Sequence, residues 1–131
     1  MQITDDWIPF GEGAYIIEQA ILCSIGEAAV MLEEAVLEIR TGPLGKKQMR
    51  GRALARNIFI VELHEESDRL DLILDLGGEF KFRMDNPQLI AGKVFSPNIK
   101  SSLQFIPRKP WTKLSVAKFE TLLSKLKFLP E

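Results

Sequence analysis

Leucine at every second position is the feature that most constrains the fold of this chain. Segment 69–76 reads Arg-Leu-Asp-Leu-Ile-Leu-Asp-Leu, and segment 80–84, Phe-Lys-Phe-Arg-Met, also alternates. Successive side chains of a β-strand point to opposite faces, so a period of two predicts a strand that buries one face. Gly77 and Gly78 lie between the two segments. We therefore predict two strands joined in a β-hairpin.

The length of the hairpin loop follows from the same alternation. Opposed residues of an antiparallel pair lie on one face of the sheet. A two-residue loop would set Leu74 opposite Lys81 and mix leucines with basic residues. A three-residue loop, 77–79, sets Leu74 opposite Phe82 and Asp75 opposite Lys81, and such loops with glycine at positive φ are common. We predict the three-residue loop.

Residues 14–40 are predicted to be helical. Gly26 interrupts this segment, which is therefore either two helices in a hairpin or one bent helix. A strand over residues 29–39 is the alternative. The helical prediction depends on apolar residues that recur at helical spacing, namely Ala28, Leu32, Ala35, Val36 and Ile39.

The middle of the chain is predicted to form a loop and then a strand. Segment 40–56 contains Gly-Pro-Leu-Gly, which favours an irregular basic loop. Segment 57–63 is predicted to be a strand that pairs with the leucine strand and sets Glu62 opposite Asp71. Opposed carboxylates repel unless a cation intervenes, and Arg83 lies nearby in this register. We predict a structural ion cluster, with an acid–base pair as the alternative.

The C-terminal part is predicted to contain two weaker strands, 89–95 and 102–106, with a turn at 96–98, and then a helix over 114–127. The whole pattern predicts a single α+β domain, 1–131. In it an N-terminal helical segment and a C-terminal helix pack on one face of a mainly antiparallel sheet of about four to five strands. The expected core contains Leu72, Leu74, Leu76, Phe80, Phe82 and Met84 on one sheet face, with Ile17, Ile21 and Phe119 packed against the sheet.

Composition bounds the class of protein. The chain has 131 residues, the size of one domain, and 46% hydrophobic and 27% charged residues are typical of globular proteins. Cys23 is the only cysteine, so an internal disulfide is excluded and we expect a small core residue. Glutamates interrupt the longest apolar region, 14–37, which argues against a membrane span, and the acidic N-terminus lacks the features of a secretory signal. We expect a cytoplasmic protein with no membrane contact.

Charge is sorted along the sequence. Before Arg40 the chain carries carboxylates and no lysine or arginine. On the predicted helix, Glu27, Glu34 and Glu38 fall within about 40° of one another. A patch of one sign attracts partners of the other sign. We predict that these glutamates form an acidic docking surface for a protein partner.

The basic segment that follows is the second candidate site. Basic side chains neutralise phosphates and glycines let backbone amides approach them, so the alternative function is binding of a phosphorylated ligand or nucleic acid. The segment has no aromatic residue for base stacking. Its basic residues are Arg40, Lys46, Lys47, Arg50, Arg52 and Arg56.

No catalytic signature stands out in the sequence. Neither a Gly-x-Ser-x-Gly element nor a phosphate-binding glycine loop is present, and His64 is the only histidine. We therefore expect no cofactor or metal and predict a non-enzymatic protein-interaction module, such as an adaptor, a secretion chaperone or a toxin-neutralising protein. A carboxylate-dependent enzyme using Glu62, Asp71 and His64 is a further alternative.

Overall fold

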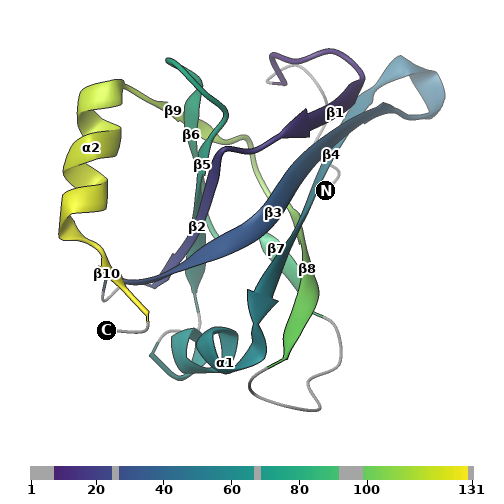
Figure 1. The fold of residues 1–131 in the computed structure, drawn as a ribbon. Helices are drawn as coiled ribbons and strands as arrows, with labels where there is room; N and C mark the ends of the chain where they lie inside the picture. The colour runs from purple at the N-terminus through teal and green to yellow at the C-terminus, as the bar shows by residue number, and fades with distance from the viewer. Residues whose placement is uncertain (1–7, 25–26, 67–68, 92–98, 130–131) are drawn as a thin grey trace.

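The protein is a curled β-sheet with two helices. The computed structural model describes residues 8–24, 27–66, 69–91 and 99–129. Within these residues ten strands form one sheet, and α-helix occurs only in two segments. Strands hold 55% of the described residues, and the sheet curls into a half-barrel (Figure 1). The predicted α+β fold, with an N-terminal helical segment and a sheet of about four to five strands, is therefore wrong.

The order of the strands across the sheet is β7-β8-β4-β3-β2-β5-β6-β9, while β1 and β10 both pair with β3. Paired strands are antiparallel except β10, which runs parallel to β3. The elements are β1 (Gly13–Ile16), β2 (Gln19–Ser24), β3 (Ala28–Thr41), β4 (Lys47–Arg56), α1 (Asn57–Glu66), β5 (Leu70–Asp75), β6 (Lys81–Met84), β7 (Gln88–Ala91), β8 (Lys100–Ile106), β9 (Thr112–Leu114), α2 (Val116–Lys125) and β10 (Lys127–Phe128).

A β-bulge in β3 explains why this strand mimics a helix in the sequence. The bulge lies between Glu33 and Val36, so two residues there oppose one residue of β4. The positions buried inside the half-barrel are therefore 28, 30 and 32 before the bulge and 35, 37 and 39 after it, while Ala29 is buried on the outer face. Positions 28, 32, 35 and 39 also match the period of an α-helix. The predicted helix over 14–40 is wrong, and the alternative of a strand over 29–39 is confirmed.

The basic segment 40–56 is a hairpin arm and a strand rather than an irregular loop. Its first residues complete β3, a tight turn follows at Pro43–Gly45, and the rest forms β4. Exposed and buried residues alternate along β4. The buried positions are the small residues Gly51, Ala53 and Ala55 and the flexible Met49. Small side chains on this inner face leave room for large side chains from β8.

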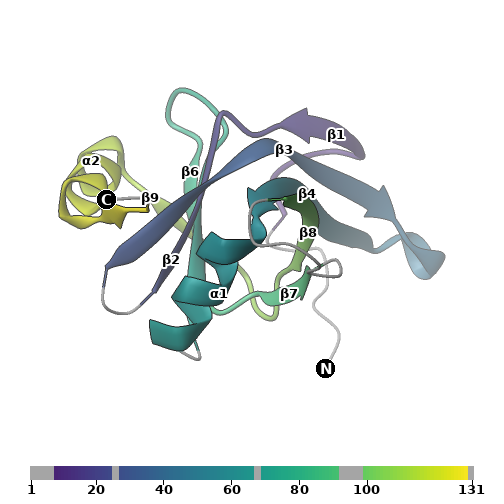
Figure 2. The same ribbon diagram turned by 60° about the horizontal axis from the view of Figure 1, so that its bottom comes forward.

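Residues 57–66 form α1 where a strand was predicted. The helix begins at Asn57, a residue type favoured at helix N-termini. Leu63 is fully buried, and Phe59 and Ile60 pack against the interior of the half-barrel. α1 lies across one end of the half-barrel (Figures 1 and 2). An apolar run of this length fits either a helix or a buried strand, and periodicity alone does not separate them.

The hairpin of β5 and β6 confirms the predicted register. Leu74 lies opposite Phe82 and Asp75 lies opposite Lys81. The backbone N–H of Leu76 donates to the carbonyl of Phe80 across the three-residue loop. The local alternation was sufficient here because a shift of one residue would have set Leu72 and Leu74 opposite Arg83 and Lys81 instead of Met84 and Phe82.

The predicted C-terminal elements are also present. β7 and β8 lie where two weaker strands were expected, and the predicted C-terminal helix is confirmed as α2. Ser115 caps this helix, since its hydroxyl oxygen accepts a hydrogen bond from the backbone N–H of Lys118. The predicted turn at 96–98 lies outside the described residues.

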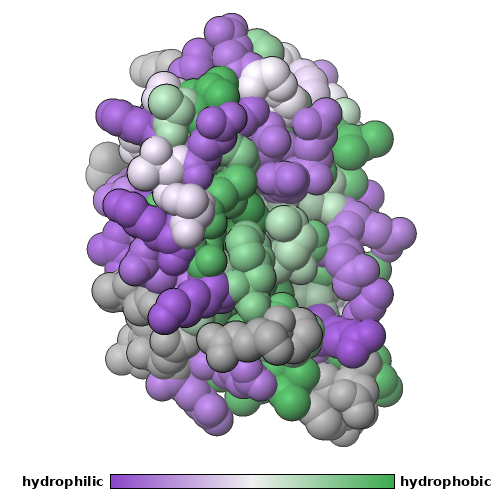
Figure 3. Space-filling view, turned by 60° about the vertical axis from the view of Figure 1, so that its left-hand side comes forward, coloured by the Kyte–Doolittle hydropathy of each residue, from purple (hydrophilic) through white to green (hydrophobic). Residues whose placement is uncertain are grey.

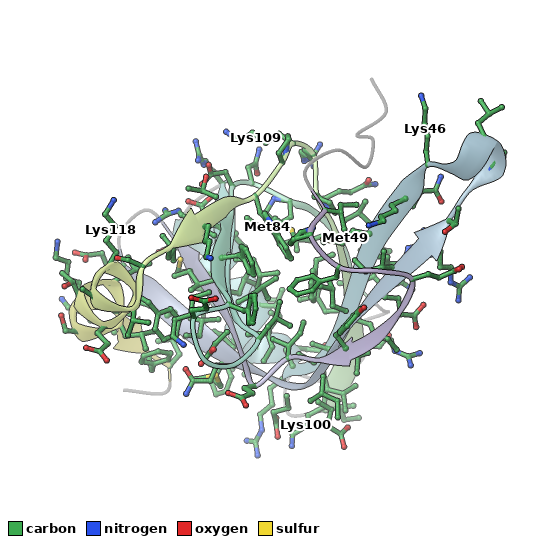
Figure 4. All side chains as sticks on the ribbon, turned by 90° about the horizontal axis from the view of Figure 1, so that it is seen from above. Lys46, Met49, Met84, Lys100, Lys109 and Lys118 are labelled. Atoms are coloured by element: carbon green, nitrogen blue, oxygen red, sulfur yellow. The ribbon has the colours of Figure 1, made fainter. Side chains whose placement is uncertain are left out.

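Core side chains lie on both faces of the sheet. The predicted residues Leu74 and Phe82 are buried inside the half-barrel, but Phe80 is exposed. Phe119 of α2 packs against the sheet as predicted, but on the face opposite the leucines, whereas Ile21 belongs to β2 of the sheet itself and points to that same outer face. The labelled side chains in Figure 4 show the two environments, with Met49 and Met84 toward the interior and Lys46, Lys100, Lys109 and Lys118 pointing outward.

Cys23 is buried beneath α2, which confirms the prediction of a core residue. Burial raises the pKa of the Cys23 thiol to about 11, although the positive charge of Arg83 acts in the opposite direction. In the described part of the chain no helix has the length and apolar character that crossing a membrane requires.

Candidate functional site

The outer face of the sheet is divided into a covered half and an open half. α2 covers the outward side chains of β2, β5 and the first part of β3. On β4 the buried residues point inward, so the residues between them point outward and are exposed or half-buried. We call the outward side chains around β4 the open sheet face. Its members are Ile16, Glu33, Val36, Glu38, Arg40, Gln48, Arg50, Arg52, Leu54, Arg56, Lys100, Ser102 and Gln104.

Basic side chains outnumber acidic ones on the open sheet face. Glu38 pairs with Arg40 at 3.1 Å and with Arg52 at 3.7 Å. Lys100 pairs with Glu33 at 2.8 Å.

Two arginines of the open sheet face form no ion pair with the described acidic residues. Among the residues that the structure describes, neither Arg50 nor Arg56 forms an ion pair. Both are exposed on β4. The face therefore carries a net positive charge that nothing described within the protein neutralises.

Apolar side chains lie among these charges. Ile16 of β1 is opposite Val36 of β3, and its side chain is 80% exposed. Leu54 of β4 is opposite Glu33 and is half-buried. Exposed apolar surface is also visible from the α2 side, where green side chains form a band between hydrophilic ones (Figure 3). Apolar surface next to unpaired arginines is typical of a surface that binds another protein.

The three glutamates of the predicted acidic surface do not share one face. Glu27 lies just before β3, Glu34 lies in its bulge, and Glu38 lies beyond it. A strand rises by about 3.3 Å per residue, so Glu27 and Glu38 are roughly 30 Å apart. Glu38 is also neutralised by two arginines. The helical face that would have joined these residues is absent from the described chain, and their role in partner binding stays a prediction.

The residues of the predicted basic site are only partly brought together. Arg40, Arg50, Arg52 and Arg56 belong to the open sheet face. Lys46 lies at the outer end of the hairpin (Figure 4), and Lys47 Nζ donates to the carbonyl oxygen of Phe10 at 2.9 Å.

The carboxylates of Glu62 and Asp71, on which the alternative of a carboxylate-dependent enzyme depends, do not lie opposite each other. Glu62 lies on α1 and is exposed, so it cannot face Asp71 across a strand pair. The side chain of His64 lies outside the described residues. Within the described ranges no group of three or more His, Cys, Asp or Glu side chains could hold a metal ion.

Asp71 instead belongs to an ion cluster on the outer face of β5 and β6. It accepts hydrogen bonds from Arg83 at 2.6 Å, from Arg69 at 3.2 Å and from the backbone N–H of Asn86 at 2.9 Å. Burial alone would raise the pKa of Asp71, but these hydrogen bonds outweigh it and lower the pKa. Arg83 also bonds to Asp85. The predicted structural ion cluster is confirmed around Asp71 and Arg83, without Glu62.

Reasoning from the sequence missed the apolar part of the open sheet face. Ile16 and Val36 were placed on a predicted helix, and Leu54 in a loop. The alternation of Met49, Gly51, Ala53 and Ala55 with polar residues was a usable signal, since it has the period of a strand. The glycines nearby concealed that signal because they also favour turns.

Comparisons with known proteins assign neither a family nor a function to the chain. No protein-family model, no curated protein and no solved structure matches the chain.

Proposed function

We propose that this protein is a non-enzymatic protein-interaction module that binds an acidic protein partner on the open sheet face. The observation that carries the proposal is the exposure of the unpaired Arg50 and Arg56 on a face that also carries apolar side chains. Leu54 lies two residues before Arg56 on β4, and Val36, which is opposite Ile16, pairs with Arg52 between the two arginines. An arginine-rich surface with an apolar centre is what stable protein interfaces use. Its positive charge favours a partner surface rich in carboxylates.

A nucleic-acid or phosphate ligand is the second candidate for the same face. Arg50 and Arg52 lie on one side of β4, about 7 Å apart, and each guanidinium could pair with a phosphate group. Among the described side chains of the open sheet face none is aromatic, so bases would have no stacking platform. The apolar side chains would also stay exposed in such a complex. The geometry therefore favours the protein partner.

The experiment compares two charge-reversed variants with the wild type. The first carries Arg50→Glu and Arg56→Glu. The control carries Lys118→Glu and Lys127→Glu, two exposed lysines on α2 and β10 with the same change in charge. Each protein is immobilised and exposed to nuclease-treated host lysate. The retained proteins are identified, and the dissociation constant of the purified partner is measured at several salt concentrations.

The proposal predicts an acidic partner that the wild type and the control retain and the Arg50/Arg56 variant loses. Its dissociation constant should rise with salt, because charge attraction is screened. Equal retention by all three proteins would refute the proposal. Binding of a labelled single-stranded oligonucleotide that the Arg50/Arg56 variant loses would establish the second candidate instead.

A further inference from the structure

The hairpin between β3 and β4 projects from the half-barrel as an arm. We call residues 40–47 the arm, and Figures 1 and 4 show it extending beyond the rest of the sheet. Leu44 lies at its turn and is 92% exposed, the highest value among the exposed large apolar residues of the described chain. A large apolar side chain in this position is not stabilised by burial in the core.

The backbone at Leu44 is also unfavourable for a leucine. The backbone N–H of Gly45 donates to the carbonyl of Gly42 at 3.2 Å, which closes a turn with Pro43 and Leu44 at its centre. Leu44 has φ 72° and ψ 14°, the conformation of the third residue of a type II turn, where glycine or asparagine is favoured. Strain of this kind persists where the surrounding structure enforces it, and it is concentrated at functional sites.

Hydrogen bonds hold the arm in a fixed position. The backbone N–H of Gly42 donates to the carbonyl of Lys46 at 2.6 Å and closes the hairpin. At its base, the backbone N–H of Thr41 donates to Glu12 Oε1 at 3.3 Å, and Lys47 Nζ donates to the carbonyl of Phe10. The ring of Pro43 further restricts the turn. A side chain presented in one orientation loses little entropy on binding.

Positive charge surrounds the exposed leucine. Arg40 and Lys46 are exposed on the arm, and Arg50 follows on β4. Of the acidic residues nearby, Glu12 lies at the base of the arm, where its Oε1 accepts the hydrogen bond from Thr41, and Glu38 of β3 is neutralised by Arg40 and Arg52. A receptor that accepts Leu44 would therefore have an apolar pocket with carboxylates around it.

We propose that Leu44 is a rigid apolar anchor that inserts into an apolar pocket with an acidic rim on the partner protein. This inference rests on the proposed function and names the residue that would give the interface its specificity. A turn that holds Leu44 in one orientation favours binding to a receptor pocket of one defined shape. A lipid bilayer accepts many orientations, and one leucine is a weak membrane anchor, since even a single myristoyl chain binds membranes only marginally.

The first test uses Leu44→Gly, because glycine removes the side chain and relaxes the turn. Leu44→Ala removes the side chain and keeps the strain. Val116→Ala is the matched control, an exposed apolar residue on α2. For the purified partner we expect both Leu44 variants to bind about tenfold more weakly or worse, which is the usual loss for a leucine that becomes buried at an interface. The melting temperature of Leu44→Gly should be unchanged or higher.

The outcomes separate the two proposals. If Leu44→Gly binds as tightly as the wild type while the Arg50/Arg56 variant does not bind, the anchor is refuted and the proposed function stands. If Leu44→Gly loses the partner while the Arg50/Arg56 variant keeps it, the arm acts without the open sheet face and the proposed function is refuted. If both variants keep the partner, both proposals are refuted.

The second test does not require a partner known in advance. A photo-crosslinking benzoylphenylalanine replaces Leu44 in the full chain, which is expressed and irradiated in its host, with the same group at Val116 as the control. We expect a protein adduct from position 44 alone, with the attachment site beside Asp or Glu residues in the partner. No adduct at position 44, or an adduct to lipid, would overturn the anchor.

Discussion

The ring of Phe105 on β8 lies over the backbone of Gly51 on β4. The two residues are paired in the sheet, and a Cβ atom on residue 51 would overlap the ring. Phe105 is fully buried, so its ring has no other space to occupy. The packing of Phe105 on β4 therefore depends on the absence of a side chain at Gly51.

We predict that Gly51→Ala lowers the free energy of unfolding by about 1–3 kcal/mol, the usual cost of overpacking. Phe105→Leu should recover part of the loss when it is combined with Gly51→Ala, because the smaller side chain makes room for the methyl group. Urea unfolding of the two single variants and the double variant gives the coupling energy. Gly11→Ala is the control, since open space surrounds that position. Additive effects of the two substitutions would contradict the predicted contact.

Leu74→Ala should lower the free energy of unfolding by about 2–5 kcal/mol. Leu74 is fully buried on β5, between Ala20 of β2 and Phe82 of β6. Met31→Ala, at a partly exposed site on the outer face, should cost much less. Denaturant unfolding measures both. A loss below about 1 kcal/mol for Leu74→Ala would show that the leucine face is not the interior of the half-barrel.

The ion cluster should make stability depend on pH in the acidic range. The pKa of Asp71 is lowered in the folded state, so the folded protein binds fewer protons than the unfolded chain near the ordinary pKa of 3.8. The contribution of Asp71 is complete above that pH and is lost as the pH falls through the lower folded pKa. Unfolding curves from pH 7 to pH 2 should show the advantage of the wild type over Asp71→Asn shrinking in that window. An advantage that stays constant over the whole range would exclude this linkage.

The thiol of Cys23 should be unreactive in the folded protein. Burial raises its pKa to about 11, so little thiolate forms at neutral pH, and the side chain lies beneath α2. We expect labelling by a thiol reagent at pH 8 to be slow and to accelerate with denaturant in parallel with unfolding. Rapid labelling of the native protein would mean that α2 does not cover Cys23.

Some elements could be predicted from the sequence because their signals are local. The leucine alternation and the two glycines of the β5–β6 hairpin determined its register, since one residue of slippage would set Leu74 opposite Lys81 instead of Phe82. The amphipathic period of α2 and its capping Ser115 likewise lie within a few residues of one another. Burial of Cys23 followed from the apolar run around it.

Other elements were decided only by tertiary packing. The bulge at Glu34 gives the buried residues of β3 a helical spacing, and only pairing with β4 shows that the chain is extended there. α1 is helical because its apolar side chains close one end of the half-barrel, where contacts outweigh the β-propensity of Ile58, Ile60 and Val61.

The candidate site divides in the same way. The sequence by itself supplied the basic residues between Arg40 and Arg56 and the unbalanced charge they carry. Only the tertiary structure decided that Arg50 and Arg56 share one sheet face with Ile16, Val36 and Leu54, and that Leu44 is 92% exposed on the arm. Composition and hydrophobic periodicity are properties of residues close together in the sequence. A binding face instead joins strands that are distant in the chain, and its exposure depends on which half of the sheet α2 covers.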